Sequence, residues 1–405
     1  MAERKIIIIG GGIAGLTAAD AARSASPGAG VTMVHKEPDL PYNRLNLTRL
    51  IAGEIEESTL TLHDASWYSE NRIEPVCGDV LAINPAERQI TLKSGKALEY
   101  SSLVIATGAS PFLPPIPGVD KSRVMTLRTI GDARKILGSV REGTKCVCIG
   151  GGLLGIELAA GLRKRGASVA ILENSEWILS RQLVKPAGTL LRERIEELGI
   201  EVHCSAEVKQ ILGTTAAEDV LLESGERLEA ELVAISAGVR PNTALAAACG
   251  LSVGRGLKVD DRMATSDPNI YAAGDVAEYE GQTFGLWPIA MSQGAVAGAN
   301  AAGADEIYRA TPPPAFLKVV GVDVFSIGDF MPKDSASSIF DMTGSGTYLS
   351  LTVKSGTLTG ANMVGDISTA QLVKRAIEGK TPKDQNQKLL GRFPGLADFM
   401  SKAKE

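Results

Sequence analysis

The first residues of the chain show an ordered pattern of apolar and small residues. Residues 6–9 are four isoleucines, and they lead into the glycine-rich sequence 10–15. An Ala-rich segment follows, and then a second apolar run. This order predicts a strand over 5–10, a helix over 13–24 and a strand over 31–35, which is the β-α-β unit of a parallel sheet.

The same order returns later in the chain. An apolar run at 145–149 leads into a second glycine sequence at 150–155. A helix over 154–165 and a strand over 168–172 are predicted to follow it. The chain therefore contains two β-α-β units with the same internal arrangement.

The repeat extends beyond the glycine sequences. Residues 103–108 are a buried-strand sequence that ends in a small-residue turn, and residues 232–238 repeat this pattern. Between the two β-α-β units we also expect strands at 76–83 and 89–92. The two parts are an internal duplication at the level of the fold.

The rest of the chain divides at prolines. A Pro-rich crossing follows residue 110, and after residue 240 the chain is expected to return to the first unit with a short strand ending at Asp275 and a helix over 293–302. Pro312–Pro314 begin a third section. Its strand-like and helical patterns lie at 317–320, 348–353, 358–360 and 368–378.

These patterns predict an α/β fold with two Rossmann-like dinucleotide-binding domains and a small C-terminal α+β domain. The expected domains are a discontinuous dinucleotide-binding domain at 1–115 and 240–310, a second dinucleotide-binding domain at 116–239 and an interface domain at 311–405.

Composition narrows the function. The net charge of -5 argues against a nucleic-acid-binding protein. No apolar run approaches the roughly 20 residues that span a bilayer, and the first strand begins close to the N-terminus, so we expect a cytoplasmic protein. The five cysteines and three histidines are scattered, and they predict no metal site. A monomer and a homodimer both remain open.

Each glycine sequence has the spacing G-x-G-x-x-G between a strand and a helix. The first glycine permits the turn, the second lets the backbone approach a pyrophosphate, and the third lets the helix pack on the strand. The helix N-terminus adds free N–H groups and a partial positive charge. Two such sequences predict two bound dinucleotides and electron transfer between them.

A family resemblance rests on the order of five motifs. They are G-G-G-x-A-G at 10–15, P-Y-N-R at 41–44, A-T-G-A-S-P at 106–111, G-G-G-L-L-G-I-E at 150–157 and I-Y-A-A-G-D at 270–275. In this order the chain resembles the FAD-dependent pyridine nucleotide-disulfide oxidoreductases. The segments at 42–44, 50–54 and 67–68 most resemble NADH:rubredoxin reductases and the FAD/NAD module of the nitrite reductase large subunit.

The resemblance implies FAD at the first glycine sequence. Glu37 is the expected acceptor for a ribose hydroxyl, although the usual acid position holds Lys36, and Arg44 is expected at the phosphates. A turn acid and a surface salt bridge are the structural alternatives. The FAD site is expected to include Gly10, Gly12, Ile13, Ala14, Gly15, Glu37, Arg44, Val80, Thr107, Gly108, Asp275 and Trp287. Helix capping by Asp275 and core packing by Trp287 are alternatives that stay open.

The second glycine sequence is expected to bind the nicotinamide nucleotide. Glu173 ends the strand at the spacing of a ribose-binding acid, and a carboxylate there repels a 2′-phosphate, so NADH is favoured over NADPH. The expected residues are Gly150, Gly152, Leu153, Gly155, Glu173 and Gly238.

Two residues are expected near the flavin ring. In the family a Lys pairs with a Glu close to flavin N5, and the corresponding residues here are Arg49 and Glu157. Arg keeps the positive charge but stays protonated, so it can position Glu157 but cannot act as an acid. Ordinary helix residues are the alternative for both.

The resulting hypothesis is an FAD-dependent NADH oxidoreductase that passes electrons to a small redox protein such as rubredoxin or ferredoxin. Residues 41–50 contain no cysteine, which argues against the thiol chemistry of many family members. The alternatives are a flavin reductase subunit of a larger redox complex, an NADH oxidase and a non-catalytic flavoprotein. The mildly basic segment 374–405 is either a docking surface for an acidic carrier or a solvated tail.

Overall fold

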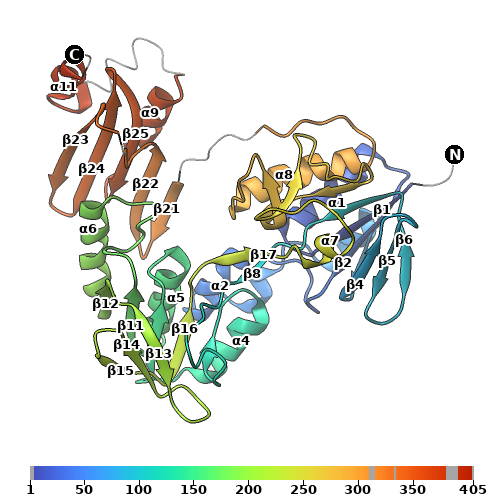
Figure 1. Cartoon of the computed structure of the whole chain (residues 1–405), viewed down its shortest axis with the longest axis horizontal. Helices are drawn as coiled ribbons and strands as arrows, with labels where there is room; N and C mark the ends of the chain where they lie inside the picture. The colour runs from blue at the N-terminus through green and yellow to red at the C-terminus, as the bar shows by residue number, and fades with distance from the viewer. Residues whose placement is uncertain (1–3, 310–314, 333, 380–390, 404–405) are drawn as a thin grey trace. The chain divides into compact units, whose positions relative to one another are not determined.

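The computed structural model describes residues 4–309, 315–332, 334–379 and 391–403. The chain forms two compact units, each built from several chain segments (Figure 1). Unit 1 comprises Met1–Asn46, Glu56–Phe112 and Gly238–Ala310, and unit 2 comprises Leu47–Ile55, Leu113–Ala237 and Thr311–Glu405. Parallel sheets covered by helices are present in both, so the predicted α/β fold class is confirmed. The three-domain division stays a prediction.

Unit 1 contains a five-stranded parallel sheet. Its strands, in spatial order, are β19 (Ile270–Ala272), β7 (Ser102–Ile105), β1 (Lys5–Ile9), β2 (Gly30–His35) and β3 (Ile73–Cys77). The central strand β1 is apolar on both faces because both faces are covered. Ile6 and Ile8 pack on α1 (Ile13–Ala25) and α8 (Trp287–Ala301).

The two helices α1 and α8 lie in close contact through glycines (Figure 1). A Cβ atom on Gly294 would lie 2.4 Å from the carbonyl oxygen of Ala14, and one on Gly298 would lie 2.0 Å from that of Ala18. The backbones can therefore approach only because both positions are glycine. Helix α8 begins at Trp287, earlier than the residue 293 expected from the sequence, with Pro288 in its first turn.

The other face of the β1 sheet packs on an antiparallel sheet, against Ile7 and Ile9. This sheet has the strands β4 (Val80–Asn84), β5 (Gln89–Leu92) and β6 (Ala97–Glu99). The single strand predicted at 76–83 is wrong, because β3 ends at Cys77 and β4 begins in a different sheet. Smaller elements complete unit 1: η1 (Arg44–Asn46), η2 (Glu57–Leu60), α3 (Ala65–Glu70), α7 (Ala244–Ala248), β18 (Leu257–Val259), η3 (Gly274–Val276) and β20 (Ala277–Tyr279).

Unit 2 repeats this architecture. Its parallel sheet has the order β12 (Ile200–Cys204), β11 (Ser168–Glu173), β10 (Lys145–Ile149), β16 (Leu232–Ile235) and β9 (Val124–Met125). Its antiparallel sheet consists of β13 (Val208–Leu212), β14 (Asp219–Leu222) and β15 (Arg227–Glu229), and it packs against Val147 and Ile149. Each strand of one parallel sheet thus has a counterpart at the same place in the other, as the sequence duplication predicts.

Four helices accompany this sheet in unit 2: α2 (Leu47–Ile51), α4 (Ile130–Ser139), α5 (Leu153–Lys164) and α6 (Lys185–Glu196). Helix α4 begins with a capping box, in which Thr129 and Asp132 satisfy each other's main-chain N–H groups. Helices α4 and α6 were not predicted from the sequence. Helix α2 comes from an early chain segment, so only tertiary contacts assign it to this unit.

Two short strands mark the points where the chain leaves unit 1 and comes back to it. Strand β8 (Ala109–Pro111) and strand β17 (Val239–Pro241) pair antiparallel within unit 1. The guanidinium of Arg240 lies 4.5 Å from the ring centre of Phe112, which adds a cation–π contact beside the paired strands.

The C-terminal section of unit 2 is an antiparallel sheet with helices, as predicted. Its strands are β21 (Ala315–Val319), β22 (Val322–Gly328), β25 (Thr357–Val364), β24 (Thr347–Lys354) and β23 (Ser337–Gly344), followed by α9 (Ala370–Ile377) and α11 (Leu396–Lys402). Asn362 is fully buried, and its side chain bonds the main chain of Gln182 and Val184. The predicted Pro312–Pro314 boundary and much of the basic segment lie outside the described residues.

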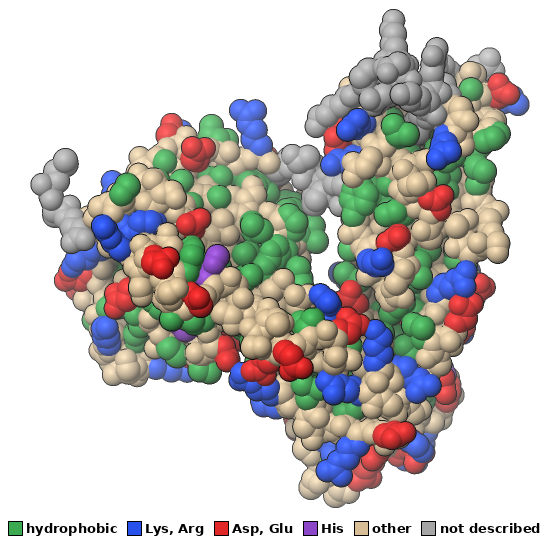
Figure 2. All heavy atoms as spheres, turned by 180° about the vertical axis from the view of Figure 1, so that it is seen from behind, with side chains coloured by type: hydrophobic (Ala, Val, Ile, Leu, Met, Phe, Trp, Pro, Cys, Tyr) green, Lys and Arg blue, Asp and Glu red, His purple; other side chains and the backbone are tan. Residues whose placement is uncertain are grey.

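Charged side chains of both signs lie interspersed on the face drawn in Figure 2. Among the described residues, no helix is long and apolar enough to cross a membrane.

Candidate dinucleotide sites

The three glycines of the first loop have different structural reasons to be glycine. Gly10 has a φ of +126°, and a Cβ atom there would lie 2.1 Å from the carbonyl oxygen of Ala106. A Cβ atom on Gly15 would lie 1.9 Å from the carbonyl oxygen of Gly10. Gly12 has no such restriction, because the one atom within 4 Å of its Cβ position is Arg44 Nη2, at 3.9 Å. Packing explains the first and third glycines, and the second borders open space.

The second loop shows the same division. Gly150 has a φ of +115°, and its Cβ position lies 2.4 Å from the carbonyl oxygen of Ser236. The Cβ position of Gly155 lies 2.0 Å from the carbonyl oxygen of Gly150, whereas nothing lies within 4 Å of that of Gly152. Open space beside the middle glycine is what a bound pyrophosphate requires.

A helix begins at each of these open positions. Gly12 and Gly152 are the N-cap residues of α1 and α5, and neither helix has a side-chain cap or an acid in its first turn. The first main-chain N–H groups of a helix have no partner within the helix. Both loops therefore present N–H donors and the positive end of a helix dipole, so their geometry fits an anionic phosphate group.

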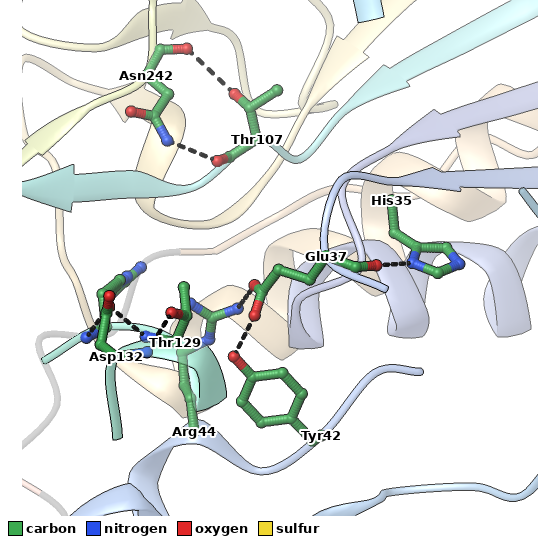
Figure 3. Close-up of polar contacts among 9 residues, drawn as sticks. His35, Glu37, Tyr42, Arg44, Thr107, Thr129, Asp132 and Asn242 are labelled. Atoms are coloured by element: carbon green, nitrogen blue, oxygen red, sulfur yellow. Dashed lines mark hydrogen bonds and ion pairs between the residues drawn. The ribbon is translucent and has the colours of Figure 1, made fainter. Parts of the chain in front are cut away.

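Glu37 lies just after β2 and is held by two side chains (Figure 3). Tyr42 donates a hydrogen bond to Glu37 Oε2 at 2.5 Å, and Arg44 Nη2 lies 3.5 Å from Glu37 Oε1. Lys36 instead forms an exposed ion pair with Asp79 at 3.3 Å. The carboxylate at 37, and not the ammonium at 36, is therefore grouped with the arginine that borders the first loop.

Glu173 lies at the equivalent place in unit 2, at the end of β11. Its carboxylate accepts hydrogen bonds from the main-chain N–H groups of Gly151 and Ser175, both at 2.7 Å. The acid is thus in direct contact with the second glycine loop, as the spacing predicts.

The sequence assigned no role to Asn242, which the structure places beside Thr107. Its side-chain amide donates to the carbonyl oxygen of Thr107 at 2.9 Å, and Thr107 Oγ1 donates to the carbonyl oxygen of Asn242 at 3.1 Å (Figure 3). Ser110 Oγ also donates to Asn242 Oδ1. These bonds hold the turn that contains Thr107 and Gly108.

Asp275 lies in the short helix η3, next to the N-terminal part of α8. Gly274 has a φ of +81°, and its N–H donates to Gln293 Oε1 at 3.0 Å. A Cβ atom on Gly274 would lie 2.8 Å from Ala14 Cβ. Asp275 is therefore held close to the start of α1, while Trp287 forms the first residue of α8.

Two further predicted residues lie in turns or strand starts. Val80 begins β4, and its half-buried side chain packs on the core beneath the β1 sheet. Gly238 has a φ of +98°, and its carbonyl oxygen accepts a hydrogen bond from the N–H of Phe112.

Glu157 is the fifth residue of α5 and is half-buried. Thr48 Oγ1 donates to Glu157 Oε2 at 3.2 Å. Burial raises the pKa of Glu157, the hydrogen bond from Thr48 opposes this rise, and the nearby Glu54 carboxylate adds to it. Arg49 is not paired with Glu157 in this structure: its Nε lies 3.1 Å from Glu54 Oε2.

Comparison with known proteins identifies the family. The profile of the pyridine nucleotide-disulphide oxidoreductases matches residues 4–294, which is most of the chain and includes both glycine loops. The chain belongs to this family. A second profile, for the rubredoxin NAD+ reductase C-terminal domain, matches residues 313–381. The family resemblance inferred from the five motifs is thus confirmed.

Relatives of this family align along nearly the whole chain. A nitrite reductase [NAD(P)H] of Bacillus subtilis is 32% identical over 96% of the chain, but the chain spans only 49% of that protein. An NADH-rubredoxin oxidoreductase of Clostridium acetobutylicum is 33% identical over 95% of the chain and 97% of its own length. The crystal structure of the NADH:rubredoxin oxidoreductase from the same organism superposes with a TM-score of 0.82 at 32% identity, covering 96% of this chain and 100% of that one.

None of the five cysteines forms a disulfide bond in this structure. Cys146 and Cys148 are buried on β10, and burial raises the pKa of both thiols, that of Cys146 to about 12. All five cysteines are unpaired. Across the described ranges, no group of three or more His, Cys, Asp or Glu side chains could hold a metal ion.

Proposed function

We propose that this chain is an FAD-dependent NADH oxidoreductase that passes electrons from NADH to a small redox protein such as rubredoxin. The observation that carries the proposal is the open space beside both Gly12 and Gly152, since packing alone requires no glycine at either position. The near-complete alignment with the NADH-rubredoxin oxidoreductase of C. acetobutylicum supports it.

The first loop is the proposed FAD site. Gly10, Gly12 and Gly15, with the N–H groups of Ile13 and Ala14, would bind the pyrophosphate at the start of α1. Arg44 would add a guanidinium, which donates to phosphate in a planar fork. Glu37 would accept from a ribose hydroxyl, and its contacts with Tyr42 and Arg44 hold it beside the loop. The remaining proposed residues are Val80, Thr107, Gly108, Asp275 and Trp287.

The second loop is the proposed NADH site. Gly150, Gly152, Gly155 and the N–H of Leu153 would bind the pyrophosphate, and Gly238 borders the same unit in sequence. Glu173 is already hydrogen-bonded to Gly151, so a carboxylate lies where the adenosine ribose is expected. Its negative charge opposes the 2′-phosphate of NADPH.

Bound FAD would supply the redox chemistry, because a flavin accepts two electrons as a hydride and releases them singly. The side chains bind and orient the nucleotides and exclude water. Glu157 and Arg49 are the residues proposed to act near the reacting rings. Arg49 offers a fixed positive charge, and burial raises the pKa of Glu157, so this carboxyl holds a proton more readily than an exposed one does.

The electron acceptor is proposed from the absence of cysteine at residues 41–50. Without a thiol there, the chain has no group at that position to form a mixed disulfide, so a protein electron carrier fits better than a disulfide substrate. We also propose that the chain works in the cytoplasm, which its unpaired cysteines favour.

A second candidate function follows from the nitrite reductase match. The chain spans about half of that relative. In this alternative it is the flavin reductase part of a larger redox complex.

The deciding experiment measures NADH oxidation by the purified, flavin-loaded chain with rubredoxin, ferredoxin, a flavodoxin-like carrier or oxygen as acceptor. The proposal expects fast reduction of rubredoxin, slow oxygen consumption and no reduction of disulfides. Gly12→Ala serves as the flavin-deficient control. Activity with oxygen alone would indicate an oxidase, activity only with a co-purifying protein would indicate a subunit, and no bleaching of the flavin by NADH would overturn the proposal.

A further inference from the structure

The short helix α2 is fixed on α5 by main-chain contacts. The carbonyl oxygen of Thr48 lies 3.1 Å from the position that a Cβ atom on Gly161 would occupy. Arg165 Nε donates to the carbonyl oxygen of Ile51 at 2.7 Å, and its Nη2 donates to that of Leu50 at 3.4 Å. Because an arginine satisfies carbonyls at the end of α2, the helix has little freedom to shift along α5.

Two cations near α2, Lys164 and Arg49, form ion pairs with Glu54. Its carboxylate accepts from Arg49 Nε at 3.1 Å and from Lys164 Nζ at 2.5 Å, and these contacts lower its pKa. Within the described part of the chain, no Lys or Arg forms an ion pair with Glu157. The charged group that most affects Glu157 is the Glu54 carboxylate, which has the same sign.

Glu157 instead meets a hydroxyl. Thr48 is 5% exposed, and its Oγ1 donates to Glu157 Oε2 at 3.2 Å across the contact between α2 and α5. A half-buried carboxylate needs donors to replace the water it has lost. A Thr side chain on a helix has two favoured rotamers, and in the one adopted by Thr48 the hydroxyl faces Glu157.

We propose that Thr48 is the residue that positions the Glu157 carboxylate, which is the role that the sequence assigned to Arg49. Through one hydrogen bond, the Thr48 hydroxyl orients the Glu157 carboxylate and favours its ionised form. Arg49 forms its ion pair with Glu54 instead. The role of this hydrogen bond in catalysis rests on the proposed function. The hydrogen bond between Thr48 and Glu157 does not depend on it.

The test measures the titration of Glu157 directly in the full-length chain. Glutamate labelled with ¹³C at the side-chain carboxyl is incorporated, and the Glu157 signal is assigned by its loss in Glu157→Gln. Thr48→Val keeps the shape of the side chain but removes the donor, so the Glu157 midpoint is expected to move to higher pH. Thr48→Ser restores the hydroxyl and the original midpoint.

Two further variants make the test specific. Glu54→Gln removes the neighbouring negative charge, so it is expected to move the midpoint to lower pH, opposite to Thr48→Val. Thr189→Val is the matched control, because the exposed Thr189 hydroxyl bonds the carbonyl oxygen of Lys185 in its own helix. It is expected to leave the Glu157 titration unchanged. If Thr48→Val does not fold, Thr48→Ala is titrated in its place.

The same variants are examined by stopped-flow reduction with NADH. Thr48→Val is expected to slow flavin reduction roughly tenfold, with rescue by Thr48→Ser. An unchanged Glu157 midpoint in Thr48→Val, or a midpoint that moves in Arg49→Lys and not in Thr48→Val, would overturn the inference. A shifted midpoint in a chain that NADH does not reduce at all would uphold the contact and refute the proposed function.

Discussion

The main-chain N–H of Gly151 donates to Glu173 Oε2 at 2.7 Å, so the acid that ends β11 is bonded to the second glycine loop. The contact joins two parts of the chain that are adjacent only because β10 and β11 are paired in parallel. It fixes the Glu173 carboxylate beside the loop that we propose binds the nicotinamide nucleotide.

Nucleotide preference should therefore depend on Glu173. The chain is expected to use NADH with a much higher kcat/KM than NADPH, and Glu173→Gln should reduce this preference roughly tenfold, because a buried or ligand-bonded charge contributes on the order of 1.4 kcal/mol or more. Steady-state kinetics with both nucleotides measure it. Glu176→Gln, at an exposed ion pair, is the control. Equal use of NADPH by the unmodified chain would contradict the prediction.

Two glycines of the first loop, Gly10 and Gly12, should differ in their effects on the stability of the apoprotein and on FAD binding. Gly10→Ala should destabilise the apoprotein by about 3 kcal/mol or more, because it combines a positive φ with a backbone clash. Gly12→Ala should cost much less, about 0.5–1 kcal/mol, because alanine is a poorer N-cap residue than glycine although the backbone is extended and the Cβ position is open. Denaturant unfolding of the apoproteins measures both.

FAD affinity completes this comparison. Gly12→Ala should weaken FAD binding at least roughly tenfold, because the added methyl group occupies the space proposed for phosphate. The affinity is measured by titrating FAD with the apoprotein and following the quenching of flavin fluorescence. If Gly12→Ala binds FAD as well as the unmodified chain does, the pyrophosphate does not lie at the first glycine loop.

Asn242 should stabilise the turn at Thr107. Asn242→Ala removes the side-chain bonds to the Thr107 carbonyl and to Ser110, and a cost of about 1–2 kcal/mol in the free energy of unfolding is expected. Ser110→Ala removes one of these bonds and should cost about half as much. Denaturant unfolding followed by circular dichroism provides the values, and equal stability of Asn242→Ala and the unmodified chain would refute the role.

Glu157 should make stability depend on pH. Its pKa in the folded chain is raised by burial above the unfolded value of about 4.3. Its contribution to stability is therefore complete below the unfolded pKa and is lost as the pH rises through the folded pKa. Glu157→Gln does not ionise, so it should gain stability relative to the unmodified chain as the pH rises from the unfolded pKa of about 4.3 through the raised folded pKa. A difference in unfolding free energy that is constant with pH would contradict this.

Thiol reactivity should follow burial. The exposed Cys77 is expected to react first with an aromatic disulfide reagent at pH 8, whereas Cys146 and Cys148 should react only after unfolding. Burial holds the pKa of the Cys146 thiol at about 12, so little thiolate forms at that pH. Mass spectrometry of the labelled peptides distinguishes the sites. Rapid labelling of Cys146 in the native chain would refute the prediction.

Local sequence was sufficient to predict the strands that are uninterrupted apolar runs. The isoleucines before Gly10 and the apolar run before Gly150 predicted central strands, because a strand buried on both faces must be apolar throughout. The segment 76–83 was misjudged because Val76 and Val80 are both apolar, whereas β3 pairs with β2 and β4 pairs with β5. Which sheet a strand joins is decided by its partner and not by its own residues.

The sequence by itself determined the duplicated units, the two glycine loops and the acid after each second strand, because turn geometry and close packing impose their residue types locally. Tertiary structure alone decided which distant side chains meet, namely Asn242 with Thr107 and Thr48 with Glu157. These pairs are separated by 135 and 109 residues. Such contacts depend on how helices and strands pack, and the spacing of residues along the chain does not predict this packing.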